Sequence, residues 1–206
     1  MNRCVIIAGA DINNYENAKK YLKDDDFIIC CDCGLRHLQK LNVKPNLIVG
    51  DFDSHQNPHL PVETIVLPCE KDDTDTGFAV KEALKREAND FLFLGVIGNR
   101  FDHSFANISI LLMLDTLGKS ALAIDDFSEL QIISSQKAFI SDKFSFFSLL
   151  NVSGTAEGIS IKNAKYPLEN AIIKSEDQYG ISNQVLPNQI AEVSIQKGRL
   201  LLIRVK

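Results

Sequence analysis

The sequence lacks any long apolar run. No segment approaches the ~20 consecutive apolar residues that a membrane span requires. The apolar stretch at residues 4–8 is too short for a secretion signal and is followed at once by polar residues. We therefore expect no contact with a membrane and a cytoplasmic location.

The sequence also lacks an excess of positive charge. It holds 22 lysines and arginines against 27 aspartates and glutamates, a formal net charge of -5 at pH 7. Such a chain has no basic field to attract nucleic acid or an anionic lipid surface. A polyanionic small molecule would need a local device to overcome repulsion, and bound Mg²⁺ is the usual one.

Three phosphate-binding motifs are missing. The tripeptide Gly118-Lys119-Ser120 resembles part of a P-loop, but the glycine required five residues before Gly118 is Met113. There is no protein-kinase signature and no Gly-x-Gly-x-x-Gly after the first expected strand. If this protein binds phosphate, it does so in another way.

The cysteines do not form a zinc motif. Five are present, and Cys30 and Cys31 fall in the apolar run at residues 27–31, where they are typical of small hydrophobic residues in a buried strand. The sequence Cys-Asp-Cys at residues 31–33 lacks the usual zinc-ligand spacing and has no second pair downstream. We therefore favour a structural interpretation over a zinc site.

The first part of the chain alternates short apolar runs with helical patterns, which is typical of parallel βαβ units. The expected strands are residues 5–8, 27–31, 47–49, 64–67, 91–96 and 121–124. The expected helices are residues 14–22, 35–41, 75–88 and 103–117, with Gly118 capping the last. Residues 1–126 are therefore predicted to form an α/β domain with a mainly parallel sheet.

The second part has short β-rich runs separated by turn residues. The expected strands are residues 130–133, 138–140, 144–150, 158–161, 171–173, 191–195 and 200–205. This spacing predicts an all-β sandwich domain at residues 127–206. Because a module of this size buries little surface, we expect it to pack on the first domain or on a second subunit.

Acidic residues follow several expected strands. Asp32, Asp51, Asp53 and Asp75 come after three of them, and Asp102 follows a fourth together with Arg100. A single Asp at such a place is more often a helix cap or turn residue. Because ligands of open α/β sheets bind at the carboxyl ends of the strands, however, several loops with acids indicate a shared site.

Asp51 and Asp53 are one residue apart, so in an extended segment both side chains lie on the same face and repel each other. Mg²⁺ would relieve this repulsion with its preference for oxygen ligands. Arg100 would clamp phosphate oxygens through its planar guanidinium. Glycines such as Gly34 would let the backbone approach a phosphate closely. The loops thus predict a magnesium-dependent enzyme that acts on a nucleotide polyphosphate.

Taken together, these loops resemble those of the thiamin pyrophosphokinase family. The resemblance rests on residues 31–34, 45–54, 71–75 and 95–103 with Ala106 and Asn107, and in the second half on residues 158–168 and 180–183. The sequences Gly-Asp-Phe-Asp-Ser at 50–54 and Arg-Phe-Asp-His at 100–103 are its most specific pair.

The resemblance implies transfer of a diphosphate from ATP to the hydroxyl group of thiamin, with Mg²⁺ as cofactor, in a homodimer whose interface holds the thiamin site. The implied catalytic acids are Asp51, Asp53, Asp75 and Asp102, of which Asp51, Asp53 and Asp75 would also bind the metal. The implied ATP-binding residues are Asp32, Gly34, Arg100 and Asn107. The implied thiamin-binding residues are Ser182 and Asn183.

The chain departs from the family pattern at three positions: Cys33 and Asn99 stand where the family usually has glycine, and Phe78 where it commonly has lysine. Two alternatives stay open at this point. The acceptor could be another hydroxymethyl heterocycle, such as a pterin, because the acidic loops indicate the nucleotide and not the acceptor. The chain could also bind thiamin or a nucleotide without turnover.

Overall fold

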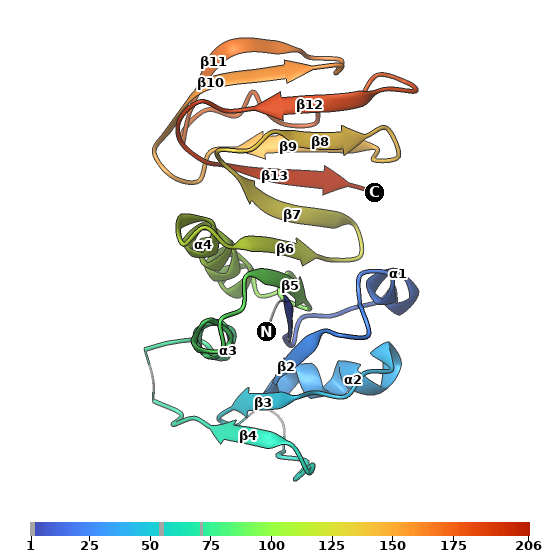
Figure 1. Ribbon diagram of the computed structural model, residues 1–206, viewed down its shortest axis with the longest axis vertical. Helices are drawn as coiled ribbons and strands as arrows, with labels where there is room; N and C mark the ends of the chain where they lie inside the picture. The colour runs from blue at the N-terminus through green and yellow to red at the C-terminus, as the bar shows by residue number, and fades with distance from the viewer. Residues whose placement is uncertain (1–2, 54–55, 71) are drawn as a thin grey trace. The chain divides into compact units, whose positions relative to one another are not determined.

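The computed structural model describes residues 3–53, 56–70 and 72–206 (Figure 1). Ser54 and Lys71, which belong to two of the motifs above, lie outside the described residues. The chain divides into two compact units, Met1–Asp126 and Phe127–Lys206.

The first unit is built on a parallel β-sheet. Its strands follow the order β4-β3-β2-β1-β5-β6, and each neighbouring pair is parallel. The strands are β1 (Arg3–Ile7), β2 (Phe27–Cys31), β3 (Leu47–Gly50), β4 (Glu63–Val66), β5 (Asp90–Leu94) and β6 (Ser120–Ile124).

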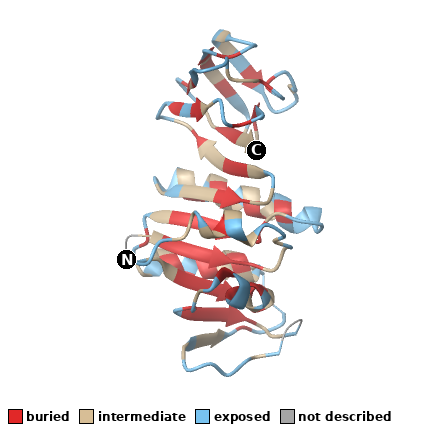
Figure 2. Cartoon of the chain, turned by 90° about the vertical axis from the view of Figure 1, so that its right-hand side faces the viewer, coloured by how far each residue is buried: buried red, intermediate tan, exposed pale blue. Residues whose placement is uncertain are grey.

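The central strands are apolar along almost their whole length because helices cover both faces of the sheet. Every residue of β3 is buried, as are all but the first residue of β1, β2 and β5 (Figure 2). Cys30 and Cys31 are buried within β2, as expected of small apolar residues. Burial raises the pKa of both thiols well above the ordinary value, so neither forms a thiolate near neutral pH.

In the described part of this unit, four α-helices pack on the sheet, and a short 3₁₀ helix, η1 (Asp32–Gly34), leads into the second. Helices α1 (Tyr15–Lys19) and α2 (Leu35–Leu41) cover one face, and α3 (Asp75–Lys85) and α4 (Phe101–Thr116) cover the other (Figure 1). Among the described residues, no helix is long and apolar enough to cross a membrane.

Side chains and a glycine define the helix ends. The Asn14 side chain accepts a hydrogen bond from the N–H of Asn17 at the start of α1, and Thr74 does the same for Gly77 at the start of α3. Gly118 follows the C-cap residue Leu117 of α4 and has a φ of 70°, as predicted for the residue that ends this helix. Helix α1 is shorter than predicted because Tyr21 and Leu22 donate to carbonyls three residues back, which ends the α-helix in turns.

The order in which the chain adds strands to the sheet reverses between β1 and β5, although these two strands are parallel. The chain adds β2, β3 and β4 on one side of β1 and then returns to place β5 and β6 on the other. In open α/β sheets, ligands bind beyond the carboxyl ends of the strands at such a switch point.

The second unit is a β-sandwich. Strand β13 (Leu200–Val205) pairs antiparallel with β7 (Ser128–Ile133) and β9 (Phe146–Leu150). The facing sheet has the order β11-β10-β12-β8 and consists of β8 (Ala138–Ser141), β10 (Thr155–Lys162), β11 (Leu168–Lys174) and β12 (Ile190–Ser194). Phe147 and Leu202 from one sheet share a buried core with Ile159 and Val193 from the other.

Strand β10 is longer than predicted and carries a register shift against β11 between Glu157 and Ile159. Gly158 sits at this irregularity with a φ of 68°, which a glycine adopts without a steric penalty. The predicted fold class, an α/β domain with a mainly parallel sheet followed by an all-β sandwich, is confirmed.

Candidate active site

A cavity of about 640 Å³ opens at the carboxyl edge of the parallel sheet. The residues that follow β1, β2, β3 and β5 line it, together with the start of α3 and the first turns of α4. The cavity therefore lies at the switch point, where the topology predicts a ligand site.

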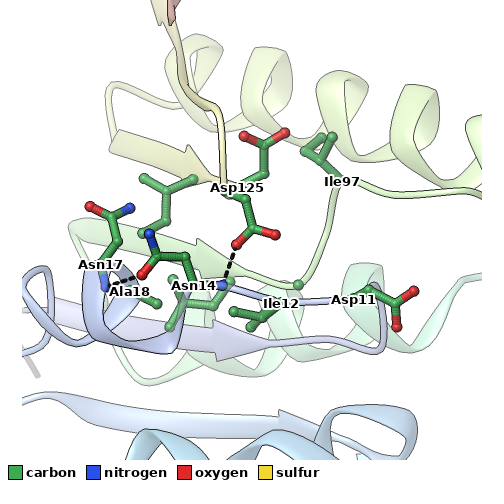
Figure 3. A pocket seen from close by; sticks show the side chains of 11 residues that line it. Asp11, Ile12, Asn14, Asn17, Ala18, Ile97 and Asp125 are labelled. Atoms are coloured by element: carbon green, nitrogen blue, oxygen red, sulfur yellow. Dashed lines mark hydrogen bonds between the residues drawn. The ribbon is translucent and has the colours of Figure 1, made fainter. Parts of the chain in front are cut away.

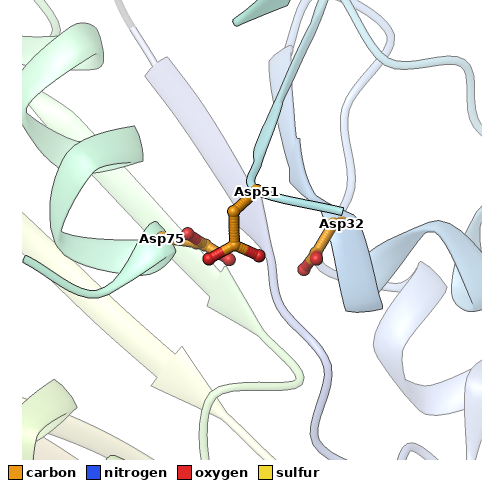
Figure 4. A group of neighbouring side chains, drawn as sticks. All are labelled: Asp32, Asp51 and Asp75. Atoms are coloured by element: carbon orange, nitrogen blue, oxygen red, sulfur yellow. The ribbon is translucent and has the colours of Figure 1, made fainter. Parts of the chain in front are cut away.

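Three carboxylates converge in this cavity. Asp32 begins η1 after β2, Asp51 follows β3, and Asp75 begins α3 (Figure 4). One oxygen from each lies within 4.8 Å of the others. Three carboxylates this close repel one another unless a cation lies between them.

Asp32 supplies the clearest sign of a missing partner. The residue is only 2% exposed, and its Oδ1 accepts a hydrogen bond from the N–H of Cys33. Its Oδ2 is buried without a hydrogen-bond partner among the described residues. A buried, unpaired carboxylate oxygen is costly, and a hard divalent cation would satisfy it. The donor set thus fits Mg²⁺.

The structure corrects the expected geometry of Asp51 and Asp53. Phe52, between them, has a φ of 58°, so the segment is not extended and the side chains need not share a face. The N–H of Asp53 lies 3.3 Å from Oδ1 of Asp51 and donates to it, which closes a local turn. Asp53 is exposed and lines the cavity, but the group of converging carboxylates contains Asp32 in its place.

Arg100 and Asp102 form an ion pair at the start of α4. Arg100 donates from Nε to Oδ1 of Asp102 over 3.0 Å and from Nη2 to Oδ2 over 2.7 Å. Arg100 lines the cavity, whereas Asp102 is not among the described residues that do. The hydrogen bonds from Arg100 hold the pKa of Asp102 well below its usual range. Asp102 therefore stays ionised at neutral pH and orients Arg100.

Gly34 and Asn107 support the cavity. A Cβ on Gly34 would lie 2.3 Å from the carbonyl oxygen of Ile7, so only glycine lets η1 pack this closely on β1. Gly34 is not among the described lining residues. Asn107 does line the cavity; it is buried, and its Nδ2 donates to the carbonyl of Val96 over 2.7 Å, which fixes the loop after β5.

Hydrogen bonds to the Asp126 carboxylate hold the loop that follows β1. The Asp126 carboxylate accepts from the backbone N–H groups of Asn13 and Asn14, the latter over 2.8 Å (Figure 3). A small pocket lies beside these contacts and shares Asp11 and Gly95 with the larger cavity. The end of β6 thus fixes one wall of the site.

His37 holds the same loop from the side of α2. Its Nε2 lies 3.0 Å from the carbonyl oxygen of Ala10, and its Nδ1 lies 2.7 Å from the hydroxyl of Tyr15. A neutral ring with its hydrogen on Nε2 satisfies both contacts, donating to Ala10 and accepting from Tyr15. Burial of the ring, followed by the neighbouring Arg36 guanidinium, lowers the pKa of His37. The folded protein therefore favours neutral His37.

We expect this histidine to make folding stability depend on pH. The unfolded chain binds a proton at this position more readily than the folded protein does. The stability that neutral His37 contributes is therefore fully present above the ordinary pKa of 6.5 and is lost as the pH falls toward the lower pKa of the folded state. As the pH is lowered from about 8 to about 5, the temperature of unfolding should fall more steeply for wild type than for His37→Gln. His59→Gln, at an exposed position, is the control and should follow wild type. Parallel profiles for wild type and His37→Gln would contradict this expectation.

In the second unit, Asn183 is tied to its own backbone surroundings. Its Nδ2 donates to the carbonyl of Tyr166 over 2.7 Å, and its Oδ1 accepts from the N–H groups of Tyr166 and Gln184. Ser182 is exposed with a φ of 57°, and its N–H donates to Oγ of Ser148 over 3.0 Å. The structure thus presents Ser182 at the surface and uses the Asn183 side chain to fix the segment at Tyr166.

Comparison with known proteins identifies the family. Residues 18–122 match the sequence model described as "Thiamin pyrophosphokinase, catalytic domain", and residues 132–200 match "Thiamin pyrophosphokinase, vitamin B1 binding domain". The chain belongs to the thiamin pyrophosphokinase family.

Individual members of the thiamin pyrophosphokinase family agree with this assignment. The thiamine pyrophosphokinase of Bacillus subtilis is 26% identical over 207 residues, which cover 97% of this chain and 96% of the relative. A crystal structure of thiamine pyrophosphokinase from Bacillus subtilis superimposes with a TM-score of 0.86 at 24% identity, covering 100% of this chain and 99% of the other. Yeast thiamin pyrophosphokinase gives a TM-score of 0.72 at 15% identity, covering 100% and 86%. The structural matches show that the fold is shared.

The positions where this member departs from the thiamin pyrophosphokinase pattern lie at or near the cavity. Cys33 and Asn99 line it. Phe78 stands on α3 where the pattern has lysine, and Lys81, three residues later on the same helix, forms an ion pair with Asp73 at the cavity wall. Lys81 is thus paired with an acid that lines the cavity, but it is not itself among the described lining residues.

Sequence reasoning missed several lining residues of this thiamin pyrophosphokinase fold. Asp11 and Arg36 line the cavity from the loop after β1 and from α2. The rule that ligands bind at strand ends covers the loop after β1 and would have found Asp11 if it had been applied there. No motif signalled Arg36, because its position depends on how the first turn of α2 faces the cavity.

Proposed function

We propose that this protein is a thiamin diphosphokinase, which transfers a diphosphate group from ATP to thiamin and releases AMP. Two lines of support lead to this proposal. Models of both thiamin pyrophosphokinase domains match the chain. The converging carboxylates of Asp32, Asp51 and Asp75 fit the magnesium that a nucleotide polyphosphate carries. The carboxylate cluster is the single observation that carries the chemistry.

In this proposal Asp32, Asp51 and Asp75 hold Mg²⁺, and Asp53 lies at the exposed edge of the same site. When bound, Mg²⁺ neutralises phosphate charge and helps to orient the transferred group. Arg100 binds phosphate oxygens from the start of α4, and Asp102 orients its guanidinium. Asn107 keeps the loop after β5 in position through Val96.

The transfer is an in-line displacement at the β-phosphorus of ATP. The thiamin hydroxyl oxygen forms a bond to that phosphorus, and the bond from the phosphorus to the bridging oxygen of the α-phosphate breaks. AMP leaves with the bridging oxygen, and the hydroxyl proton passes to a carboxylate of the site and then to solvent. Such a reaction depends mainly on alignment and charge neutralisation, which the converging loops supply.

The second unit would contribute the thiamin contacts. Its residues 132–200 match a domain described as binding vitamin B1. Ser182 would contact thiamin directly, and Asn183 would act by fixing the exposed Tyr166 beside it. We further propose a homodimer in which this site lies at the subunit interface.

The reaction is tested by incubating purified protein with ATP, Mg²⁺ and thiamin and separating the products. We expect AMP and thiamin diphosphate to form in equal amounts, with neither formed when thiamin or Mg²⁺ is left out. A panel of other hydroxymethyl heterocycles, including a pterin, should give much slower release of AMP. Formation of ADP alone, or release of AMP that does not depend on thiamin, would contradict the proposal.

A further inference from the structure

The cavity carries far more negative than positive charge. The carboxylates of Asp11, Asp32, Asp51, Asp53, Asp73 and Asp75 line it. Among the described lining residues, the lysines and arginines are Arg36 and Arg100. A polyphosphate that enters such a cavity needs every available cation in addition to Mg²⁺. The proposed function assigns a role to Arg100 and leaves Arg36 without one.

Arg36 has hydrogen-bond donors to spare. Its Nη2 donates to the carbonyl of Gly9 and, over 2.9 Å, to Oδ1 of Asp11. Within the described chain, its Nη1 has no hydrogen-bond partner. A guanidinium has five N–H donors, so the Gly9 and Asp11 contacts leave part of it unused.

The third contact of Arg36 is weak. Its Nε lies 3.4 Å from Nε2 of His37, but that ring nitrogen carries the hydrogen that His37 donates to Ala10. A protonated ring nitrogen cannot accept a hydrogen bond. The Nε of Arg36 therefore also lacks a good acceptor, and the guanidinium is held at one edge only.

The Arg36–Asp11 ion pair does not lock the guanidinium in place. The side chains are 46% and 63% exposed, and ion pairs this exposed contribute little to stability. A phosphate oxygen is a stronger acceptor for a planar guanidinium than a solvated carboxylate held through one nitrogen. Arg36 is thus able to turn toward an anion in the cavity at small cost.

Arg36 and Arg100 approach the cavity from different sides. Arg36 lies in α2, which covers one face of the sheet, and Arg100 precedes α4, which covers the other (Figure 1). We propose that Arg36 is a second phosphate-binding arginine, which contacts the polyphosphate of the nucleotide from the side opposite Arg100. This inference rests on the proposed use of a nucleotide polyphosphate.

Calorimetric binding of Mg²⁺-loaded, non-hydrolysable ATP analogue tests the inference without turnover. We expect Arg36→Gln to weaken binding by about ten-fold or more, as for loss of one charge-assisted hydrogen bond, and Arg36→Lys to weaken it less. Lys40→Gln is the matched control, because it removes one positive charge from an exposed position on the same helix outside the cavity lining. It should bind like wild type.

Asp11→Asn separates binding from support of the loop. If Arg36 binds phosphate, removing the competing carboxylate should tighten binding of the analogue. If Arg36 only anchors the loop through Asp11, Asp11→Asn should weaken binding as much as Arg36→Gln does. That result, or wild-type affinity in Arg36→Gln, would overturn the inference. Thermal unfolding of each variant reports whether it folds. If Arg36→Gln does not fold, the two single variants Asp11→Asn and Arg36→Lys still decide the question.

Steady-state kinetics distinguish this inference from the proposed function. Arg36→Gln should raise KM for ATP while KM for thiamin stays near its wild-type value. If wild type binds the analogue but forms no thiamin diphosphate, the proposed function fails and the binding series still tests Arg36. If wild type forms thiamin diphosphate and Arg36→Gln leaves KM for ATP unchanged, only the Arg36 inference fails. Failure of wild type to bind the analogue would overturn both.

Discussion

Replacement of Asp32 by Asn is expected to lower turnover at least about a hundred-fold and, without Mg²⁺, to raise the temperature of unfolding. The carboxylate of Asp32 lies beside those of Asp51 and Asp75. Its buried Oδ2 has no hydrogen-bond partner among the described residues. An Asn amide has the same shape, removes one negative charge and offers donors to the remaining carboxylates. The oxygen that accepts from Cys33 is retained.

Two measurements check this prediction. Product formation reports turnover, and thermal unfolding with and without Mg²⁺ reports stability. Wild type should gain stability from Mg²⁺, and Asp32→Asn should gain less while unfolding a few degrees higher without the ion. Asp24→Asn, at an exposed position of the same unit, is the control and should change neither quantity. If Asp32→Asn keeps the full response to Mg²⁺, Asp32 is not part of the metal site.

Replacement of Gly50 by Ala is expected to displace Asp32 and so disturb the same group of carboxylates. A Cβ on Gly50 would lie 2.5 Å from Cβ of Asp32 and 3.0 Å from its Cγ, closer than side-chain atoms approach. Because both positions are buried, relief requires a shift of η1 or β3. We expect a loss of about 1–3 kcal/mol in the free energy of unfolding, together with a large loss of turnover.

Gly77→Ala is the matched control for Gly50→Ala. Gly77 lies in α3 near the cavity, and a Cβ there would meet its nearest atom at 3.4 Å. Because alanine fits this helical position, the substitution should stabilise the protein by about 0.4–1 kcal/mol and leave turnover in place. Chemical denaturation and the product assay check both variants. Equal behaviour of the two variants would show that the contact between Gly50 and Asp32 has no role.

The fold could be predicted from the sequence where the hydrophobic pattern and the breaking residues agree. The bounds of β2, α2 and β13 were predicted to the residue, because continuous apolar runs or a clear helical period end at polar or turn residues there. The start of β9 was less clear. Phe144 is buried and extends the apolar run, but its N–H donates to Ser141 in a turn, so the strand begins at Phe146.

The candidate site could be predicted in outline but not in its internal geometry. The rule that ligands bind at strand ends brought Asp32, Asp51 and Asp75 to one edge of the sheet, where the structure also places them. It could not reveal the positive φ of Phe52, because a bulky residue rarely adopts that conformation and only the surrounding fold imposes it. For this reason Asp51 and Asp53 were expected to form the metal-binding pair, whereas the structure groups Asp51 with Asp32 and Asp75.

The central claim is that a diphosphate group moves from ATP to thiamin in a single transfer. ATP labelled in its β-phosphate tests this claim most directly when it is supplied with Mg²⁺ and thiamin. The account predicts that the label appears in thiamin diphosphate and that the AMP released is unlabelled. Label recovered in ADP, or thiamin recovered as an unlabelled monophosphate, would contradict it.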